Sequence, residues 1–299
     1  MAYRSIENLY KAREILNDKE CYAMEKIHGT SAHVSFNPET GLTFYAGGVG
    51  HAEFVATFDQ DHLLKAFQAL YGYGSLPAIK KVTVYGEAYG GKCQRMSDVY
   101  GLPLRFVAFE VYVEDTVSDK WENVPEAEAI CKILGLEFVD YARIPVTLSA
   151  LDEQRDRESV QAIRNGIGPG KQREGVVLRP IVERVDHRGN RVMAKHKAAN
   201  FRETKSPREI DPNKLVVLDN AQAIADEWVT DERLQHVLQR LQLLGAQLDM
   251  THTRAIINEM IEDVKRESEG EVVWSDVVEK SIGRATALLY KRLVSQVGV

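Results

Sequence analysis

The chain has 299 residues, of which 44% are hydrophobic and 27% charged, a composition ordinary for a globular protein and a length that suits two domains. No stretch approaches the roughly 18 uninterrupted apolar residues of a membrane span, and the N-terminus has no apolar run after a basic start, so neither a membrane partner nor a secretory signal is expected. The net charge of −6 argues against nucleic-acid binding over the whole surface, and three widely spaced cysteines fit a reducing compartment better than a disulfide framework or a zinc site.

Strand patterns dominate the first two thirds of the chain, and helical patterns interrupt them. A helix or an irregular cover is expected before residue 20, and a turn at residues 37–41 separates two strands. The mixture, without a regular strand–helix repeat, predicts an α+β fold of largely antiparallel sheets. Strands are expected at 22–27, 33–36, 42–45, 81–87, 104–113, 138–141, 174–179 and 192–197, and helices at 54–71, 125–134 and 152–165.

After Pro207 and Pro212 the apolar residues recur at three- and four-residue spacing, as at Leu234, Val237 and Leu244. This pattern predicts a small all-helical domain. We therefore divide the chain into one domain at residues 1–210 and a second at 211–299. Helices are expected at 219–229, 231–248, 251–267 and 272–296.

One lysine, Lys26, stands in a strand that otherwise carries little charge. Gly29 follows three residues later, so the strand ends in a tight turn where small residues leave room for a nucleotide. An uncharged lysine amine can attack the α-phosphorus of a nucleotide and expel pyrophosphate. Taken alone, Lys26 also fits a solvated lysine at the end of a strand.

Positive charge is concentrated in residues 179–208, which hold nine Lys and Arg against three acids, whereas residues 211–299 hold ten against fifteen. Within the basic segment, Lys195 and Lys197 share one face of a strand while His196 points away. Two lysines on one face would neutralise the charge that develops on a reacting phosphate. The alternative is a lysine pair that protects an edge strand from aggregation.

Three carboxylates, Glu87, Glu110 and Glu174, lie beside apolar strand residues and need polar partners. They could orient a hydrated Mg²⁺ or bind ribose hydroxyls, although single glutamates at strand ends are often solvated. Residues 86–93 match the first seven positions of a P-loop, but Cys93 replaces the required Ser or Thr and no helix pattern follows. A P-loop is therefore excluded.

Five short strings occur in an order and spacing typical of one enzyme superfamily. They resemble motifs I, III, IIIa, IV and V of the covalent nucleotidyltransferases, which include polynucleotide ligases and capping enzymes, and most closely those of the RNA ligase 2 family. This resemblance implies an ATP-grasp-like adenylyltransferase domain of antiparallel sheets with flanking helices, followed by a small helical domain where DNA ligases carry an OB fold. The strings are Lys-Ile-His-Gly-Thr at 26–30, Tyr-Gly-Glu at 85–87, Phe-Val-Ala-Phe-Glu at 106–110, Glu-Gly-Val-Val-Leu at 174–178 and Lys-His-Lys at 195–197.

The resemblance also implies an ATP-dependent RNA ligase that needs Mg²⁺ or Mn²⁺. A covalent lysyl-AMP would form, AMP would pass to a 5′-phosphate end, and a 3′-hydroxyl would displace it, at nicks in duplex RNA or RNA–DNA hybrids. Such an enzyme is expected in the cytoplasm, or in the host cytoplasm if a phage encodes it. The implied catalytic residues are Lys26, Lys195 and Lys197. The implied nucleotide ligands are Glu25 at the adenine amine, Ile27, Glu87 at the ribose, Phe109 or alternatively Phe106 stacked on the base, and Glu174. Glu87 and Glu174 would also hold the metal through water, and Ser31 and Arg179 would contact substrate.

Two departures from the family pattern concern the joining steps. Ser31 stands where the family usually has Asn, and residues 45–50 contain no Arg where the family usually has one. AMP capture is therefore expected more firmly than strand joining. The alternatives are a DNA ligase, a capping-type guanylyltransferase, or a relative that binds nucleotide or RNA without sealing. The sequence carries no signal for the oligomeric state.

Overall fold

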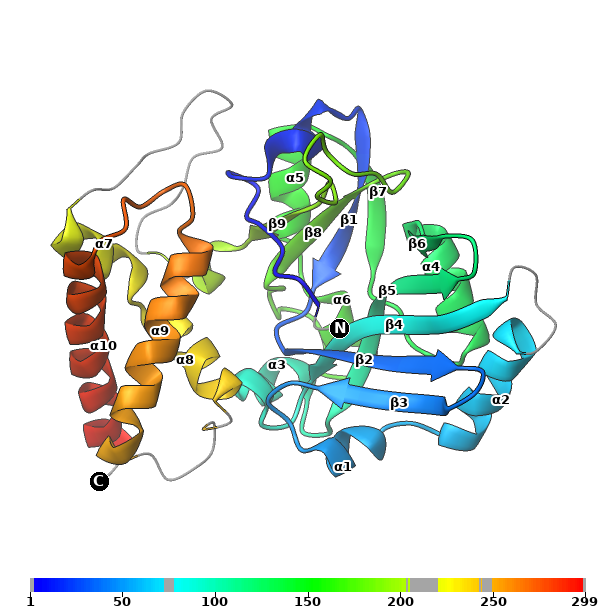
Figure 1. Cartoon of the computed structure of the whole chain (residues 1–299), viewed down its shortest axis with the longest axis horizontal. Coiled ribbons are helices and arrows are strands. Elements are labelled where there is room, and N and C mark those ends of the chain that lie inside the picture. Colours follow the sequence, from blue (N-terminus) through cyan, green and yellow to red (C-terminus); the bar gives the residue numbers. More distant parts are fainter. Residues whose placement is uncertain are drawn as a thin grey trace. The chain divides into compact units, whose positions relative to one another are not determined.

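The computed structural model describes residues 3–72, 78–202, 204, 220–241, 243 and 249–297. The chain divides into one unit of Met1–Asn8 and Ala12–His196 and a second unit of Leu9–Lys11 and Lys197–Val299. Strands mark the first unit and helices the second (Figure 1). The predicted boundary between residues 210 and 211 lies outside the described residues and stays a prediction. None of the described helices is long and apolar enough to cross a membrane.

The smaller sheet of the first unit has four strands in the order β7-β1-β8-β9, and β1 is antiparallel to both of its neighbours. Tyr22 and Met24 of β1 point into the core, which they share with Val84 and Val107 of the larger sheet. Because side chains alternate along a strand, Lys26 follows the direction of Tyr22 and Met24, and Glu25 points to the opposite face. The strands are β1 (Glu20–Lys26), β7 (Tyr141–Pro145), β8 (Gly175–Pro180) and β9 (Ala194–Lys197).

The larger sheet has five antiparallel strands in the order β3-β2-β4-β5-β6, with an irregularity in the β4–β5 pairing at Tyr85 and Gly86. Gly29 joins the two sheets, and a Cβ added there would lie 2.3 Å from the carbonyl oxygen of Ala88. Only glycine fits this crossing. The strands are β2 (Thr30–Asn37), β3 (Gly41–Ala46), β4 (Ile79–Tyr89), β5 (Arg105–Asp115) and β6 (Asp119–Trp121).

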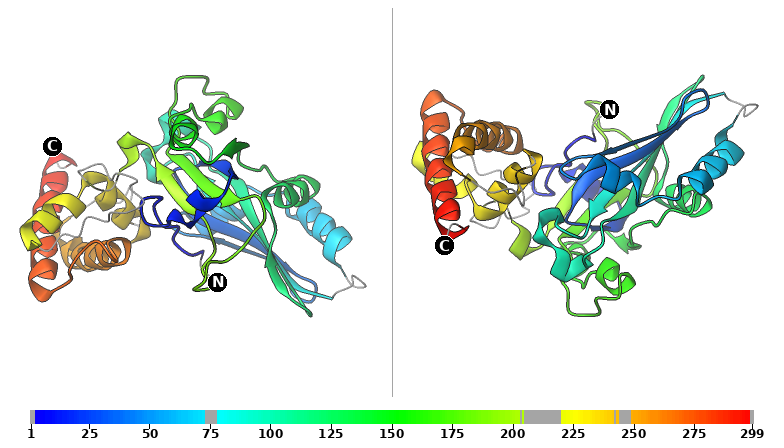
Figure 2. Two further views of the ribbon diagram at one scale, coloured as in Figure 1. Left: turned by 90° about the horizontal axis from the view of Figure 1, so that it is seen from above. Right: turned by 90° about the horizontal axis from the view of Figure 1, so that it is seen from below.

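Short helices flank both sheets of the first unit. Phe67 of α2 stacks on Phe36 of β2, with ring centroids 5.3 Å apart, and α5 packs against the smaller sheet. Figure 2 distinguishes these blue-to-green helices and strands from the yellow-to-red helices of the second unit. The helices are η1 (Arg13–Asn17), α1 (His51–Val55), α2 (Gln60–Tyr71), η2 (Cys93–Arg95), α3 (Ser97–Tyr100), α4 (Val124–Ile133), α5 (Leu148–Arg155) and α6 (Val160–Arg164).

The predicted α+β class with antiparallel sheets is confirmed, and three local predictions need correction. The helices expected at 54–71 and 152–165 are each broken in two, because Asp59 accepts the His62 amide and Ser159 accepts the Ala162 amide, and such caps start new helices. Before residue 20, the short 3₁₀ helix η1 lies among irregular residues, which agrees with the irregular cover that was one of the two expectations. The strand expected at 138–141 lies at 141–145.

The second unit is helical, as predicted, with a core that includes Trp228, Met260 and Tyr290. The segment Leu9–Lys11 belongs to this unit, and the Nζ of Lys11 lies 2.9 Å from a carboxylate oxygen of Glu271. Leu244 and the last part of the helix expected at 231–248 lie outside the described residues. The helices are η3 (Ala199–Phe201), α7 (Ala221–Trp228), α8 (Asp231–Arg240), η4 (Met250–His252), α9 (Thr253–Glu267) and α10 (Asp276–Val297).

Asp263 of α9 is the polar centre of the helical unit. Its carboxylate is buried and receives Arg233 Nη1 at 2.5 Å and Arg240 Nη2 at 2.9 Å, and it also contacts Arg266. Arg233 is itself buried, so loss of the Asp263 carboxylate would remove a hydrogen-bonded counter-charge from a guanidinium that water does not reach. The helical unit therefore depends on Asp263 for charge balance.

We expect Asp263→Ala to lower the free energy of unfolding by about 3–5 kcal/mol, the usual cost of removing one partner of a buried ion pair. Urea unfolding followed by far-UV circular dichroism measures the change. Glu262→Ala is the matched control, because Glu262 is exposed on the same helix and its loss should cost less than about 0.5 kcal/mol. Equal stability of the two variants would contradict this account.

Candidate active site

The structure brings Lys26 and Glu174 together from positions 148 residues apart. The Nζ of Lys26 lies 2.9 Å from Oε2 of Glu174, and Nδ1 of His28 lies 3.2 Å from the same oxygen. Glu174 is only 1% exposed, whereas Lys26 at the end of β1 is partly open. The predicted motif I and motif IV residues therefore form one charged centre.

Gly175 explains how Glu174 reaches Lys26. In the β1–β8 register, Gly175 lies opposite Lys26 and Val176 lies opposite Glu25, so regular alternation would point Glu174 to the face of Glu25. Gly175 instead has φ +150°, a conformation that side chains rarely adopt, and the alternation is interrupted there. The Glu-Gly order of this motif thus sets the direction of the carboxylate.

The turn after Lys26 is held by three side chains. The Gly29 amide donates to Oε1 of Glu87 at 3.1 Å, and Nε2 of Gln94 donates to the Gly29 carbonyl at 3.3 Å. The His28 amide donates to the Tyr100 hydroxyl at 3.3 Å. Glu87, predicted as a ribose and metal ligand, therefore lies beside motif I.

Gln94 and Tyr100 were missed at the level of sequence. Both follow Gly90 and Gly91, which indicate only a turn. Gln94 adopts φ 50°, a strained conformation for a residue other than glycine and one that often marks a functional site. Burial raises the pKa of Tyr100 well above its usual value, so its phenol stays neutral beside the charged centre. Neither the strain nor the burial could be read from the residue types.

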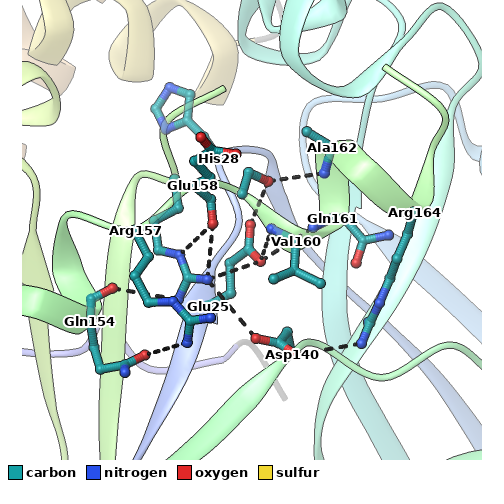
Figure 3. A network of polar contacts seen from close by, with 12 residues as sticks. Glu25, His28, Asp140, Gln154, Arg157, Glu158, Val160, Gln161, Ala162 and Arg164 are labelled. Carbon is teal, nitrogen blue, oxygen red and sulfur yellow. Dashed lines mark hydrogen bonds and ion pairs between the residues drawn. The ribbon is translucent and has the colours of Figure 1, made fainter. Parts of the chain in front are cut away.

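Glu25 points to the opposite face of β1, where its carboxylate meets the beginning of α6 (Figure 3). It accepts the Ser159 hydroxyl at 2.5 Å, the Val160 amide at 2.9 Å and the Gln161 amide at 3.3 Å. Arg173 lies 3.8 Å away. The side chain that the resemblance assigned to the adenine amine is 3% exposed and engaged by the protein itself.

Arg179, predicted to contact substrate, is fully buried. Its Nη2 lies 2.5 Å from Glu183 and its Nη1 lies 3.4 Å from Glu110, and Arg191 binds both oxygens of Glu110 at 2.9 Å. Arg179 and Glu110 therefore take part in a buried ion network. The contact of Arg179 with substrate stays a prediction.

The remaining predicted ligands lie on the strands near motif I. Ser31 lies opposite Glu87 in the β2–β4 register, and Ile27 is buried in the core. Of the two candidate aromatic residues, Phe109 packs edge-on against Tyr3, with centroids 5.2 Å apart. Phe106 packs on the other side, within a cluster that includes Phe54 and Phe58.

Lys195 and Lys197 lie on β9, as predicted. His196 between them is directed to α5, where its Nε2 lies 2.7 Å from Oδ1 of Asp152 and 3.0 Å from Nη1 of Arg155. Alternation along the strand then gives the two lysines the other face. The positive charge of residues 179–208 is partly neutralised within the protein, because Arg179, Arg184 and Arg191 form ion pairs with carboxylates. Fewer of these cations can therefore bind a phosphate.

Within the described residues, no group of three or more His, Cys, Asp or Glu could hold a metal ion. The site instead offers the carboxylates of Glu174 and Glu87. This donor set fits Mg²⁺ or Mn²⁺ held in a largely hydrated form, because Mg²⁺ keeps several waters and takes one or two carboxylates. It does not fit a metal enclosed by protein ligands.

The fold and the order of the site residues resemble those of nucleotidyltransferases of the ligase class, and a comparison with known sequences identifies the family. A sequence model of the RNA ligase family matches residues 19–197, which is more than half of the chain and contains all five motifs. The chain belongs to the RNA ligase family. No curated protein matches its sequence.

A solved structure of an RNA ligase shares the fold. A lysine-to-alanine variant of Naegleria gruberi RNA ligase with ATP and Mn has a TM-score of 0.50 and 12% identity, over 67% of this chain and 57% of that chain. The same ligase with PPi gives a TM-score of 0.49 and 13% identity over the same shares. This chain thus spans 57% of the length of that ligase.

The pH dependence of stability tests the network around Glu110. Burial by itself would raise the pKa of the Glu110 carboxyl, but Arg179 and Arg191 hold it below its ordinary value. Such a group stabilises the fold above its unfolded-state pKa of about 4.3, and the stabilisation is lost as the pH falls through the lower folded-state value. We expect the urea midpoint to fall with acid below about pH 5 more steeply in the native protein than in Glu110→Gln.

Glu126→Gln serves as the control, because Glu126 is exposed on α4 and should leave the acid limb of the stability curve unchanged. Parallel curves for the native protein and Glu110→Gln would show that the network does not depend on the ionised carboxylate.

Proposed function

We propose that this protein is an ATP-dependent RNA ligase in which Lys26 forms a covalent lysyl-AMP. The observation that carries the proposal is the 2.9 Å contact between Lys26 Nζ and Glu174 Oε2, in a chain that belongs to the RNA ligase family. The Naegleria gruberi ligase variant that shares the fold was solved with ATP and Mn, which agrees with this chemistry. Three buried cysteines in the thiol form support a cytoplasmic location.

In the first step the Lys26 amine attacks the α-phosphorus of ATP. A P–N bond forms, the bond to the β-phosphate oxygen breaks, and pyrophosphate leaves. Lys26 must first lose a proton, and the Glu174 carboxylate is within hydrogen-bond reach to accept it. Lys195 and Lys197 would neutralise the charge on the α-phosphate. A Mg²⁺ or Mn²⁺ ion held through water by Glu174 and Glu87 would withdraw further charge from the phosphates.

The later steps use the same charged centre. An oxygen of a 5′-phosphate end attacks the phosphorus of the lysyl-AMP. The P–N bond breaks, which frees the Lys26 amine, and AMP is joined to the strand through a 5′–5′ pyrophosphate linkage. A 3′-hydroxyl then attacks the 5′-phosphorus, a phosphodiester forms and AMP leaves. We propose nicked duplex RNA or RNA–DNA hybrid as substrate. In the described part of the chain the elements after Lys197 are all helices, which favours this assignment over DNA ligases with an OB fold.

Self-adenylylation tests the first step. Incubation with Mg²⁺ and α-³²P-ATP should give a label on the polypeptide that survives denaturation and is absent from Lys26→Ala, because the P–N bond requires that amine. Lys132→Ala is the control, since Lys132 is exposed on α4 and should label normally. A label in Lys26→Ala would rule out the proposed nucleophile, and a label from GTP alone would indicate a capping-type enzyme.

Sealing assays test the substrate. We expect faster sealing of a nick with RNA at the 3′-hydroxyl side than of an all-DNA nick, by at least about tenfold, the loss that a site built for a hydroxyl imposes when the hydroxyl is missing. Gel electrophoresis of labelled strands gives the rates. Self-adenylylation without sealing of any nick would instead identify a sealing-defective relative, in line with Ser31 and the absence of Arg at residues 45–50.

A further inference from the structure

Two ion pairs lie on opposite faces of the β1–β8 ladder, and they are built from two neighbouring pairs of residues. Lys26 and Glu174 meet at 2.9 Å on the core-facing side. The residues that precede them, Glu25 and Arg173, meet at 3.8 Å on the other side. Each face of the β1–β8 ladder therefore carries one acid–base pair, Lys26–Glu174 on the core-facing side and Glu25–Arg173 on the other side.

The Glu25–Arg173 pair is held in place by several contacts with the protein. The Glu25 carboxylate accepts three hydrogen bonds, from one hydroxyl and two amides, and the Arg173 guanidinium lies 3.8 Å away as its counter-charge. At 3% exposure no ligand can reach it without displacing Ser159 or α6. Glu25 is thus tied to a helix and is closed to the nucleotide base.

Arg173 is equally fixed. It is 1% exposed, and its Nε and Nη2 donate to the Glu158 carbonyl at 3.3 and 3.1 Å, while Nη1 donates to the Gln154 carbonyl at 3.5 Å. These carbonyls belong to the end of α5 and the loop before α6. Arg173 also lies 3.9 Å from Asp140, next to β7. The guanidinium therefore connects the start of β8 to both flanking helices.

We propose that Glu25 and Arg173 form a positioning pair that holds the backbones of Lys26 and Glu174 in register, so that the nucleophile and its carboxylate stay in contact. The inference rests on the proposed function for its kinetic consequence. Neighbouring residues on a strand share a peptide bond, so a shift of Glu25 moves Lys26. Displacements of about 1 Å are enough to lower a catalytic rate by about two orders of magnitude.

The positioning role and an adenine-binding role for the Glu25 side chain predict different kinetics. A positioning residue affects the rate of lysyl-AMP formation at saturating ATP and leaves ATP affinity and base preference unchanged. A residue that binds the adenine amine affects the apparent affinity for ATP and the preference for ATP over GTP. Measuring the rate and the affinity separately therefore distinguishes the two roles.

The experiment compares Glu25→Gln, Arg173→Gln and the double variant with the native protein in single-turnover self-adenylylation. We expect each single variant to lose at least about tenfold in maximal rate with half-saturating ATP within about twofold of native. The double variant should lose clearly less than the product of the two single losses, because both changes remove the same Glu25–Arg173 ion pair. Arg173→Lys keeps the charge and should retain more activity than Arg173→Gln.

Arg164→Gln is the matched control. Arg164 lies on α6 and pairs with Glu137 and Asp140, but it does not contact Glu25 in the described structure. It should label at the native rate. A raised half-saturating ATP concentration or lost ATP preference in Glu25→Gln, or native rates in both single variants, would overturn the positioning role.

A second readout does not depend on catalysis. Trace acetylation followed by digestion and mass spectrometry measures the reactivity of the Lys26 amine, with exposed Lys132 as the internal reference. We expect Lys26 to react at least about threefold faster in Glu25→Gln and Arg173→Gln, because the ammonium is released from Glu174. If the acetylation rate of Lys26 is unchanged in both variants, the positioning role is overturned, whether or not the native protein forms lysyl-AMP. If the native protein forms no lysyl-AMP, the proposed function is overturned, and the acetylation result still decides the positioning role.

Discussion

The buried carboxylate of Glu174 is the constraint on which the rest of the first unit depends. A carboxylate that is 1% exposed needs cationic or hydrogen-bonding partners, and Lys26 and His28 lie against it. To bring these three side chains together, one sheet must present Lys26 on its core side, the chain must cross to the second sheet at Gly29, and Gly175 must reverse the direction of Glu174. Two glycines without side-chain chemistry thus determine where the charges meet.

The site and its support follow one design. Both strands that carry proposed catalytic lysines also carry a neighbouring residue bound to a helix on the opposite face. Glu25, beside Lys26, binds α6, and His196, between Lys195 and Lys197, binds α5. Burial disfavours the protonated form of His196 and lowers its pKa, while the hydrogen bond to Asp152 opposes that shift. Helices of five and eight residues are too short to be stable by themselves, so these polar ties also hold them on the sheet.

Much of the fold and of the charged centre could be predicted from sequence, because strand alternation and motif order are local. Lys26, Glu174, Lys195 and Lys197 were singled out in this way, and their catalytic roles stay predictions. The role of Arg173, the contacts of Gln94 and Tyr100, and the enclosure of Arg179 depend on residues far away in the chain, and no residue type reveals them. The resemblance singled out Glu25, but its partners Ser159 and Arg173 come from segments more than 130 positions later in the chain, so its burial was not foreseen.

The segment Leu9–Lys11 has a consequence for how the molecule is made. Most contacts within a helix are local, yet in the helical unit Lys11 donates to the carbonyl of Glu267, 256 positions further along the chain. Contacts of such separation form late, because a long loop must close first. During synthesis, the segment Leu9–Lys11 can bind its partners only after nearly the whole polypeptide has been made. A fragment that starts at residue 197 lacks this segment of the helical unit.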